Sequence, residues 1–204
     1  MIGIIDYGLG NVLAFENIYK TLNIQVKIIK FGKQISSCNK LILPGVGSFD
    51  HAMALLNESG MMDDINHAVL IKKIPILGVC IGMQILANFS MEGVGKGLGW
   101  IDGEVVSFES IGIDENLKLP QIGWNTVEKL SNNKLFEGID VGKRFYFLHS
   151  FFYKCFDDSN SIAITNYGIK FTSAICKNNI YGVQFHPEKS HKNGIKLLSN
   201  FARL

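Results

Sequence analysis

Short apolar runs alternate with amphipathic segments along the first half of the chain. The apolar runs at residues 1–5, 25–29, 40–43 and 76–80 have the length and composition of buried strands. The segments between them predict helices at residues 12–22, 50–57, 61–72 and 82–89. Strands and helices alternating at these lengths are typical of βαβ units. We therefore expect an α/β fold with a doubly wound, mostly parallel central sheet and helices on both faces.

The second half of the chain has a different pattern. A glycine-rich loop at residues 90–99 precedes alternating or apolar runs at 104–108, 124–127, 144–149, 161–167, 172–177 and 180–184. Turn residues separate these runs, and the next predicted helix spans residues 190–201. This pattern indicates an antiparallel or mixed extension of the sheet. Because no linker or repeat interrupts the chain, we expect one domain spanning residues 1–204.

The composition excludes several classes of function. A hydrophobic content of 47% with 19% charged residues describes a compact globular protein, and the net charge of +2 gives no strong field. No basic stripe with interleaved aromatic residues occurs, so we expect no direct binding to nucleic acid. The longest apolar stretch, residues 74–89, contains polar residues and is too short to span a bilayer. We therefore expect no membrane attachment.

The cysteines are scattered rather than paired. Cys38, Cys80, Cys155 and Cys176 form no C-x-x-C motif and have no histidines at zinc-binding spacing, so we expect no metal site and no cofactor. Scattered cysteines in a chain without a signal peptide fit a reducing compartment. We accordingly expect a cytoplasmic protein.

One cysteine stands in a motif that carries chemistry. Glycines lie two residues before and two residues after Cys80, in Gly78-Val79-Cys80-Ile81-Gly82. This is the pattern of a nucleophile elbow with Cys in place of Ser, at the point where a predicted strand turns into a helix. The alternative is a buried cysteine in a glycine-containing core strand. A catalytic cysteine needs a base elsewhere in the chain.

Two further glycine-rich loops follow predicted strands, so both should lie at the same sheet edge as Cys80. In Pro44-Gly45-Val46-Gly47-Ser48-Phe49 the glycines leave the backbone free to aim its N–H groups, as an oxyanion hole requires. An ordinary strand-to-helix turn with Ser48 or Asp50 as N-cap is the alternative. The loop at residues 8–11 begins like a dinucleotide-binding motif, but Leu13 replaces its third glycine and the acidic residue expected downstream is absent.

His186 is the preferred base among the five histidines. It ends a predicted strand and is followed by Pro187 and Glu188. In an extended segment the side chains at i and i+2 share a face, so Glu188 could orient the imidazole and stabilise its protonated form. His149, at the end of an aromatic strand, is the second candidate. The remaining three histidines are expected on surface helices.

These motifs together resemble a known family. The Cys80 elbow and the segment from Gly182 to Glu188 are similar to those of class I (triad) glutamine amidotransferases, which have a flavodoxin-like sheet. Four other stretches resemble the glutaminase subunits of imidazole glycerol phosphate synthases more narrowly: residues 5–11, 43–49, 119–125 and 146–150. The match runs essentially from end to end of the chain.

The resemblance implies a Cys-His-Glu triad that hydrolyses L-glutamine to glutamate and ammonia. Cys80 would attack the side-chain amide, His186 would transfer the protons and Glu188 would hold the imidazole ring. The backbone N–H groups of Val46 and Ile81 would form the oxyanion hole. The residues implied to contact glutamine are Gly45, Gly47, Gln84, His149, Ser150 and Phe151.

The resemblance also implies a partner, a synthase subunit of the (β/α)8-barrel type that forms a heterodimer and receives the ammonia. Asn11, Trp124 and Asn125 are the expected interface residues, although simple core packing would also explain Trp124. Three departures from the histidine-pathway pattern, at residues 12–15, Gln121 and Phe151, are expected on the docking side and raise a second candidate acceptor. That alternative is a sugar amidotransferase of surface-polysaccharide biosynthesis. Less favoured are a γ-glutamyl hydrolase or peptidase of the same fold and a non-catalytic binding module.

Overall fold

The computed structural model describes residues 1–112 and 117–204. Within them, β7 and β9 form a two-stranded sheet and the other strands form a large mixed sheet. The strands are β1 (Ile2–Ile5), β2 (Val26–Ile29), β3 (Lys40–Gly45), β4 (Ile76–Cys80), β5 (Phe89–Ser90), β6 (Gly103–Ser107), β7 (Gln121–Thr126), β8 (Glu128–Lys129), β9 (Arg144–His149), β10 (Phe151–Cys155), β11 (Ser161–Tyr167), β12 (Ile169–Lys177) and β13 (Ile180–Val183). The helices are α1 (Val12–Thr21), α2 (Phe49–Glu58), α3 (Met62–Asn66), α4 (Ile81–Gln84) and α5 (His191–Arg203). Shorter helical turns are η1 (Gly32–Ser37), η2 (His67–Ile71), η3 (Glu109–Ile111), η4 (Lys134–Phe136), η5 (Asp158–Asn160) and η6 (Pro187–Lys189).

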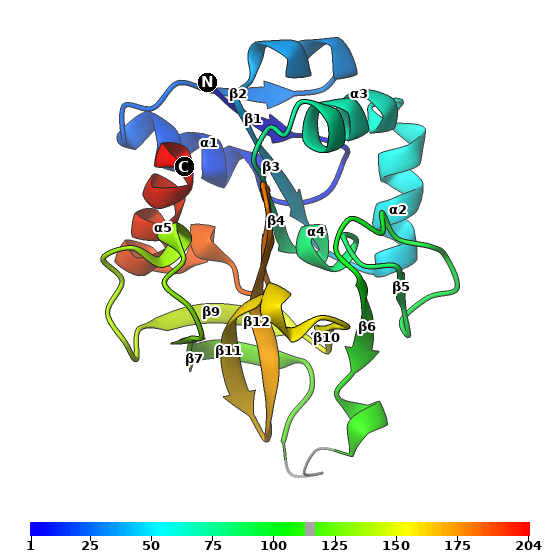
Figure 1. The fold of residues 1–204 in the computed structure, drawn as a ribbon, viewed down its shortest axis with the longest axis vertical. Coiled ribbons are helices and arrows are strands. Elements are labelled where there is room, and N and C mark those ends of the chain that lie inside the picture. Colours follow the sequence, from blue (N-terminus) through cyan, green and yellow to red (C-terminus); the bar gives the residue numbers. More distant parts are fainter. Residues whose placement is uncertain (113–116) are drawn as a thin grey trace.

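The large sheet has the strand order β2-β1-β3-β4-β13-β12-β10-β6-β5. The first five strands in this order, β2, β1, β3, β4 and β13, are parallel to one another. The strands β12, β10 and β6 then continue the sheet with antiparallel pairing. Figure 1 shows this sheet nearly edge-on, with α1 and α5 on one face and α2, α3 and α4 on the other. The expected doubly wound sheet with an antiparallel extension is confirmed.

The central parallel strands β1, β3 and β4 are buried on both faces, which explains why they read as continuous apolar runs. All residues of β1 and of β4 are buried, and in β3 Lys40 alone is partly exposed. The amphipathic helices cover the two faces; α1, for example, buries Phe15 and Tyr19 on its apolar side. The sequence pattern therefore located these elements to within a few residues.

The helix predicted at residues 82–89 is wrong in length, because α4 ends at Gln84. The backbone N–H groups of Leu98, Gly99 and Trp100 bind the carbonyls of Ile85, Ala87 and Leu86 at 2.8–3.0 Å. The returning glycine-rich loop thus occupies the carbonyls that a longer helix would use. Instead, residues 89 and 90 form the edge strand β5.

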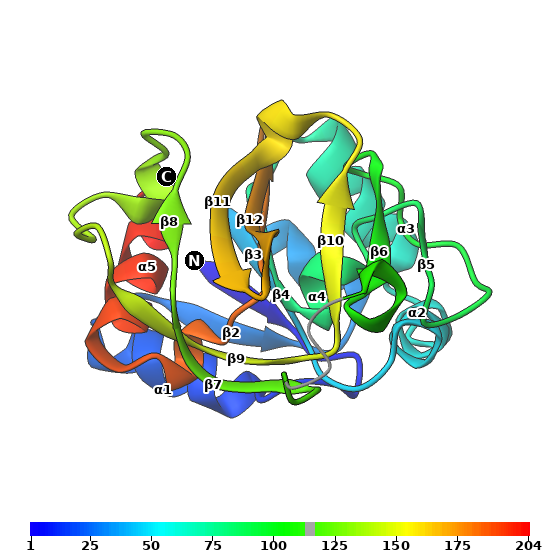
Figure 2. The same cartoon turned by 90° about the horizontal axis from the view of Figure 1, so that it is seen from below.

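The strand predicted at residues 144–149 is confirmed as β9, but the pattern missed the strand that follows it, β10. The two strands separate at Ser150 and join different sheets. Strand β9 pairs with β7 in the two-stranded sheet, whereas β10 continues the large sheet between β12 and β6. Figure 2 shows β7 and β9 running together across one end of the molecule, below the large sheet. The chain therefore changes sheets close to His149.

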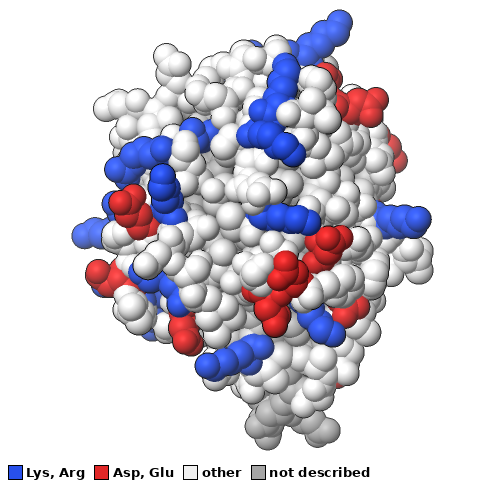
Figure 3. All heavy atoms as spheres, viewed as in Figure 1, with Lys and Arg blue, Asp and Glu red and all other residues white. Residues whose placement is uncertain are grey.

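The surface visible in Figure 3 carries interspersed basic and acidic side chains rather than a field of one sign. This matches the small net charge of +2. Among the residues that the structure describes, no helix combines the length and the hydropathy needed to cross a membrane.

Candidate active site

Cys80 occupies a strained turn between β4 and α4. Its backbone has φ of 54° and ψ of −112°, a conformation that residues other than glycine rarely adopt. The two flanking glycines make the turn possible. A Cβ on Gly82 would overlap the carbonyl oxygen of Leu43, and a Cβ on Gly78 would overlap that of Gly82. The close approach of three backbone segments therefore fixes the position of the thiol.

Two polar groups approach the Cys80 sulfur. Sγ lies 3.9 Å from the carbonyl oxygen of Leu148 on β9, and Nε2 of Gln184 lies 3.8 Å from Sγ. Gln184 is fully buried just after β13, the strand next to β4. Our sequence reasoning assigned it no role, although a glutamine inside an apolar segment is a recognisable signal.

His186 and Glu188 form a buried pair. His186 Nδ1 lies 2.8 Å from Glu188 Oε1, and the two side chains are only 2% and 4% exposed. The local backbone differs from the predicted extended segment, because Pro187 begins the 3₁₀ turn η6 directly after His186. The fixed φ of Pro187 suits the first position of such a turn, and the turn still brings the carboxylate to the ring.

The main chain of His186 is held as firmly as its ring. Its N–H donates to the carbonyl of Tyr146 at 2.8 Å, and its carbonyl accepts from the hydroxyl of Ser190 at 2.6 Å. The same hydroxyl accepts a hydrogen bond from the N–H of Tyr146 at 3.0 Å. Strand β9 therefore anchors His186 through Tyr146 and approaches Cys80 through Leu148.

The two candidate bases have opposite electrostatic environments. Burial lowers the pKa of His186, but the neighbouring Cys80 and Glu188 outweigh this effect and raise it to about 10. Burial lowers the pKa of His149 to about 4, against the opposing effect of its hydrogen bond to Phe151. His149 Nδ1 lies 2.8 Å from the carbonyl oxygen of Phe151, so in the neutral ring this nitrogen is the donor. Near neutral pH, His186 holds a proton to transfer and His149 is uncharged.

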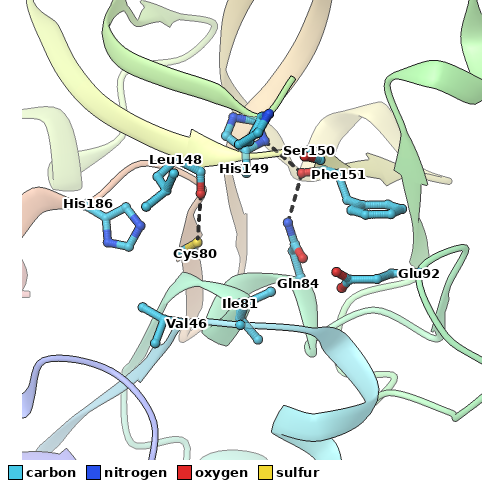
Figure 4. A pocket seen from close by; sticks show the side chains of 12 residues that line it. Val46, Cys80, Ile81, Gln84, Glu92, Leu148, His149, Ser150, Phe151 and His186 are labelled. Carbon is cyan, nitrogen blue, oxygen red and sulfur yellow. Dashed lines mark hydrogen bonds between the residues drawn. The ribbon is translucent and has the colours of Figure 1, made fainter. Parts of the chain in front are cut away.

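Cys80 and His186 share one cavity of about 240 Å³ (Figure 4). Its wall combines the loop after β3, the elbow, the end of β9 and the start of β10. The lining residues are Val46, Gly47, Cys80, Ile81, Gln84, Glu92, Pro120, Leu148, His149, Ser150, Phe151 and His186. Of the predicted contact residues, Gly45 alone is outside this lining, because it is buried against the Tyr7 hydroxyl and the backbone of Gly82.

Two polar side chains, Gln84 and Glu92, lie at one side of the cavity. Gln84 is buried, and its Nε2 donates to the carbonyl of Phe151 at 2.9 Å and to Oε1 of Gln184 at 3.0 Å. Its Oε1 has no hydrogen-bond partner among the described residues. The half-buried Glu92 points toward Gln84 from the loop after β5 (Figure 4). Sequence reasoning missed Glu92, for which the signal was a single acidic residue within the glycine-rich loop.

Comparison with known proteins identifies the family of the chain. The family described as Glutamine amidotransferase class-I matches residues 3–204. Imidazole glycerol phosphate synthase subunit HisH of Leptospira interrogans is 52% identical over 204 residues, covering 100% of both chains. The subunit of the same name from Bdellovibrio bacteriovorus is 50% identical over the same length and coverage. The chain belongs to the class-I glutamine amidotransferase family.

Solved structures agree on the fold. A crystal structure described as a glutamine amidotransferase has a TM-score of 0.75 at 17% identity, covering 100% of this chain and 99% of that one. A putative gmp synthase subunit a protein of Thermoplasma acidophilum has a TM-score of 0.71 at 23% identity, covering 99% and 92%. Family membership makes this chain a glutamine-hydrolysing enzyme.

The three predicted interface residues of this amidotransferase lie outside the cavity. Trp124 is 37% exposed and stacks on His191, with ring centroids 5.1 Å apart. Asn11 caps α1 by accepting a hydrogen bond from the N–H of Ala14. Asn125 donates from Nδ2 to the carbonyl of Asn166 at 2.8 Å. Core packing alone therefore does not account for Trp124, whereas both asparagines also serve the fold.

Two of the departures from the histidine-pathway pattern lie in or next to the cavity. Gln121 is 2% exposed and pairs with His149 across β7 and β9. Phe151 lines the cavity. Gln121 therefore lies beside a cavity-lining residue, and Phe151 forms part of the wall itself. At residues 12–15, Leu13 has a side chain that is 59% exposed.

Proposed function

We propose that this chain is the glutaminase subunit of an imidazole glycerol phosphate synthase, and that it supplies ammonia for histidine biosynthesis. The observation that carries the proposal is the buried His186–Glu188 pair in a cavity shared with Cys80, within a chain that matches such subunits over its full length. We also propose that residues 1–204 form one domain, as the family match from residue 3 to residue 204 supports.

In the first half of the reaction, the Cys80 thiolate attacks the side-chain carbonyl carbon of glutamine. The carbon–sulfur bond forms as the His186 imidazolium donates its proton to the departing nitrogen. The carbon–nitrogen bond then breaks, leaving ammonia and a thioester. The raised pKa of His186 fits this role because it keeps the proton on the ring until the leaving group takes it. Glu188 stabilises the positive charge of the imidazolium.

In the second half, water attacks the thioester while His186, now neutral, accepts its proton. The carbon–sulfur bond breaks, glutamate leaves, and Cys80 and His186 return to their starting charges. Negative charge develops on the substrate oxygen in both halves. We assign the stabilisation of this charge to the backbone N–H groups of Val46 and Ile81. Both residues line the cavity beside Cys80. One donor of this kind contributes about 3–4 kcal/mol to the transition state.

Recognition of glutamine requires groups for its α-ammonium and α-carboxylate. Oε1 of Gln84 and the carboxylate of Glu92 are acceptors on the same side of the cavity, and both suit an ammonium group. The backbone of Gly47 and the hydroxyl of Ser150 lie on the wall and offer donors to a carboxylate. His149 contributes by holding the Phe151 carbonyl, which also orients Gln84.

The released ammonia needs a protected route to its acceptor, because ammonium, its main form near neutral pH, is a poor nucleophile. We propose a heterodimer with a (β/α)8-barrel synthase subunit and a docking face that includes Asn11, Trp124 and Asn125. The half-exposed Trp124 supports this choice, since aromatic residues of this kind often anchor interfaces. We place the complex in the cytoplasm, where the chain's four free thiols remain reduced.

The experiment is to purify the chain with candidate synthases and measure glutamine hydrolysis. We expect weak activity for the chain alone, a rise on addition of a barrel-type imidazole glycerol phosphate synthase and its ligand, and complete loss in Cys80→Ser. Stimulation by a sugar amidotransferase instead would assign the chain to the surface-polysaccharide alternative. Strong turnover without any partner would favour a γ-glutamyl hydrolase or peptidase, and full activity in Cys80→Ser would reject the mechanism.

A further inference from the structure

Helix α2 and the loop after β5 exchange carboxylate hydrogen bonds. From the helix, Asp50 accepts from the backbone N–H of Val94 at 3.0 Å and from that of Gly95 at 3.1 Å. From the loop, Glu92 Oε2 accepts from the backbone N–H of Phe49 at 2.8 Å. We call these three hydrogen bonds the Asp50–Glu92 clamp. Each side of the clamp donates main-chain N–H groups to an acidic side chain of the other side.

The clamp serves the helix as well as the loop. Ser48, the N-cap residue of α2, makes no side-chain capping hydrogen bond, so the Glu92 carboxylate satisfies an N–H group that would otherwise lack an intrahelical partner. A negative charge at this end of α2 is favourable because of the helix dipole. With Oε2 engaged in this way, the second oxygen of Glu92 remains available to the cavity.

The loop has little else to hold its tip. Val94 is fully exposed and Met91 is 56% exposed, so apolar burial does not fix this part of the chain. Other hydrogen bonds hold the two ends of the loop: the N–H of Met91 donates to the carbonyl of Val105, that of Glu92 to the hydroxyl of Ser90, and that of Gly97 to the carbonyl of Asn88. At the tip the chain lies directly against Asp50, since a Cβ on Gly93 would overlap the Asp50 carboxylate.

We propose that Asp50 is a positioning residue for glutamine binding: through the clamp it holds Glu92 at the cavity wall, where the Glu92 carboxylate contacts the α-ammonium group of glutamine. This inference rests on the proposed function of the site. Asp50 is outside the cavity lining, and its carboxylate binds the loop, so its effect passes through the loop. The clamp therefore determines specificity for an α-amino acid amide over a simple amide.

The test compares two substrates in the complex with the synthase subunit: L-glutamine and 4-carbamoylbutanoate, which is glutamine without its α-amino group. The variants are Asp50→Ala, the milder Asp50→Asn, and Glu92→Gln. Asp63→Asn is the matched control, because Asp63 is an exposed acidic residue in the first turn of α3. Circular dichroism and thermal unfolding check that each variant is folded.

We expect Asp50→Ala and Glu92→Gln to lower kcat/KM for glutamine about tenfold or more, mainly by raising KM, and Asp50→Asn to have a smaller effect in the same direction. For 4-carbamoylbutanoate we expect all values to stay within about twofold of the wild type, because the lost contact involves a group that this substrate lacks. Asp63→Asn should match the wild type with both substrates. The double variant Asp50→Ala/Glu92→Gln should be no worse than Glu92→Gln alone, because the two residues act in series.

Equal losses for both substrates would overturn the positioning role, as would additive losses in the double variant. The additivity measurement uses glutamine only, so it decides the question even if the deaminated substrate reacts slowly. A wild-type complex that fails to hydrolyse glutamine would reject the proposed function instead, so the two failures are distinguishable.

Discussion

His186 Nδ1 lies 2.8 Å from Glu188 Oε1, and the two side chains are almost completely buried. This one contact orients the imidazole so that its other nitrogen, Nε2, remains without a partner in the described structure. Both Nε2 and the Cys80 thiol belong to the cavity that we assign to glutamine. In the proposed mechanism, the pair supplies the proton carrier that the strained Cys80 needs as a nucleophile.

Replacing Glu188 with Gln should lower kcat for glutamine hydrolysis by about a hundredfold or more. The amide keeps the size of the side chain but removes the charge that stabilises the imidazolium, while the KM for glutamine should change little. Steady-state kinetics of the complex test this expectation, with Glu58→Gln on the exposed side of α2 as the control. A Glu188→Gln variant with wild-type kcat would exclude the triad assignment.

The raised pKa of His186 predicts a specific dependence of stability on pH. The folded state binds this proton with a pKa of about 10, whereas an unfolded histidine has a pKa of about 6.5. The stabilisation is therefore complete below about pH 6.5 and is lost as the pH rises to about 10. The difference in the free energy of unfolding between the wild type and His186→Gln should shrink steadily across this interval. Urea titrations at several pH values measure it, and a difference that grew with pH would contradict the ion pair.

The backbone strain at Cys80 predicts that the cysteine needed for function lowers the stability of the fold at this position. The positive φ costs of order 1–3 kcal/mol for a residue with a Cβ. Cys80→Gly should therefore unfold at a higher denaturant concentration than Cys80→Ala, although we expect both variants to be inactive. Chemical denaturation of the two variants provides the comparison. Equal midpoints would mean that the turn stores no strain.

Trp124→Ala should weaken binding of the synthase subunit by about tenfold or more, because it removes an aromatic anchor from the proposed docking face. The Trp124 ring stacks on His191 and meets Tyr146 edge-on, so the two neighbours hold it in place before docking. Isothermal titration calorimetry measures the affinity. Phe31→Ala is the control, since Phe31 is a 69% exposed aromatic residue that closely follows β2, and Figure 1 shows β2 and β7 at opposite ends of the molecule. Equal effects of both variants would remove Trp124 from the interface.

The sequence predicted those parts of the site that depend on local geometry. The elbow around Cys80 is readable because its glycines are required by close backbone contacts within the turn itself. The central parallel strands are readable because burial on both faces makes them continuously apolar. The elbow and the segment from Gly182 to Glu188 indicated the family, which the comparisons confirm.

The parts that the sequence did not predict depend on contacts between distant segments. Glu92 reaches the cavity because its loop is held against α2, and no local pattern encodes that contact. The break between β9 and β10 at Ser150 depends on the pairing of the two halves of one aromatic run with two different sheets. Gln184 acquires its position beside Cys80 because β13 pairs with β4 in parallel register.

The most direct test of whether Cys80 releases the ammonia follows the amide nitrogen of glutamine into the product. The complex with the imidazole glycerol phosphate synthase subunit is supplied with glutamine labelled with ¹⁵N in the side-chain amide, in the presence of excess unlabelled ammonium. Mass spectrometry then measures the label in the imidazole product. We predict that the wild-type complex incorporates ¹⁵N and that the Cys80→Ser complex incorporates only unlabelled nitrogen. Undiminished ¹⁵N incorporation by the Cys80→Ser complex would contradict the central claim.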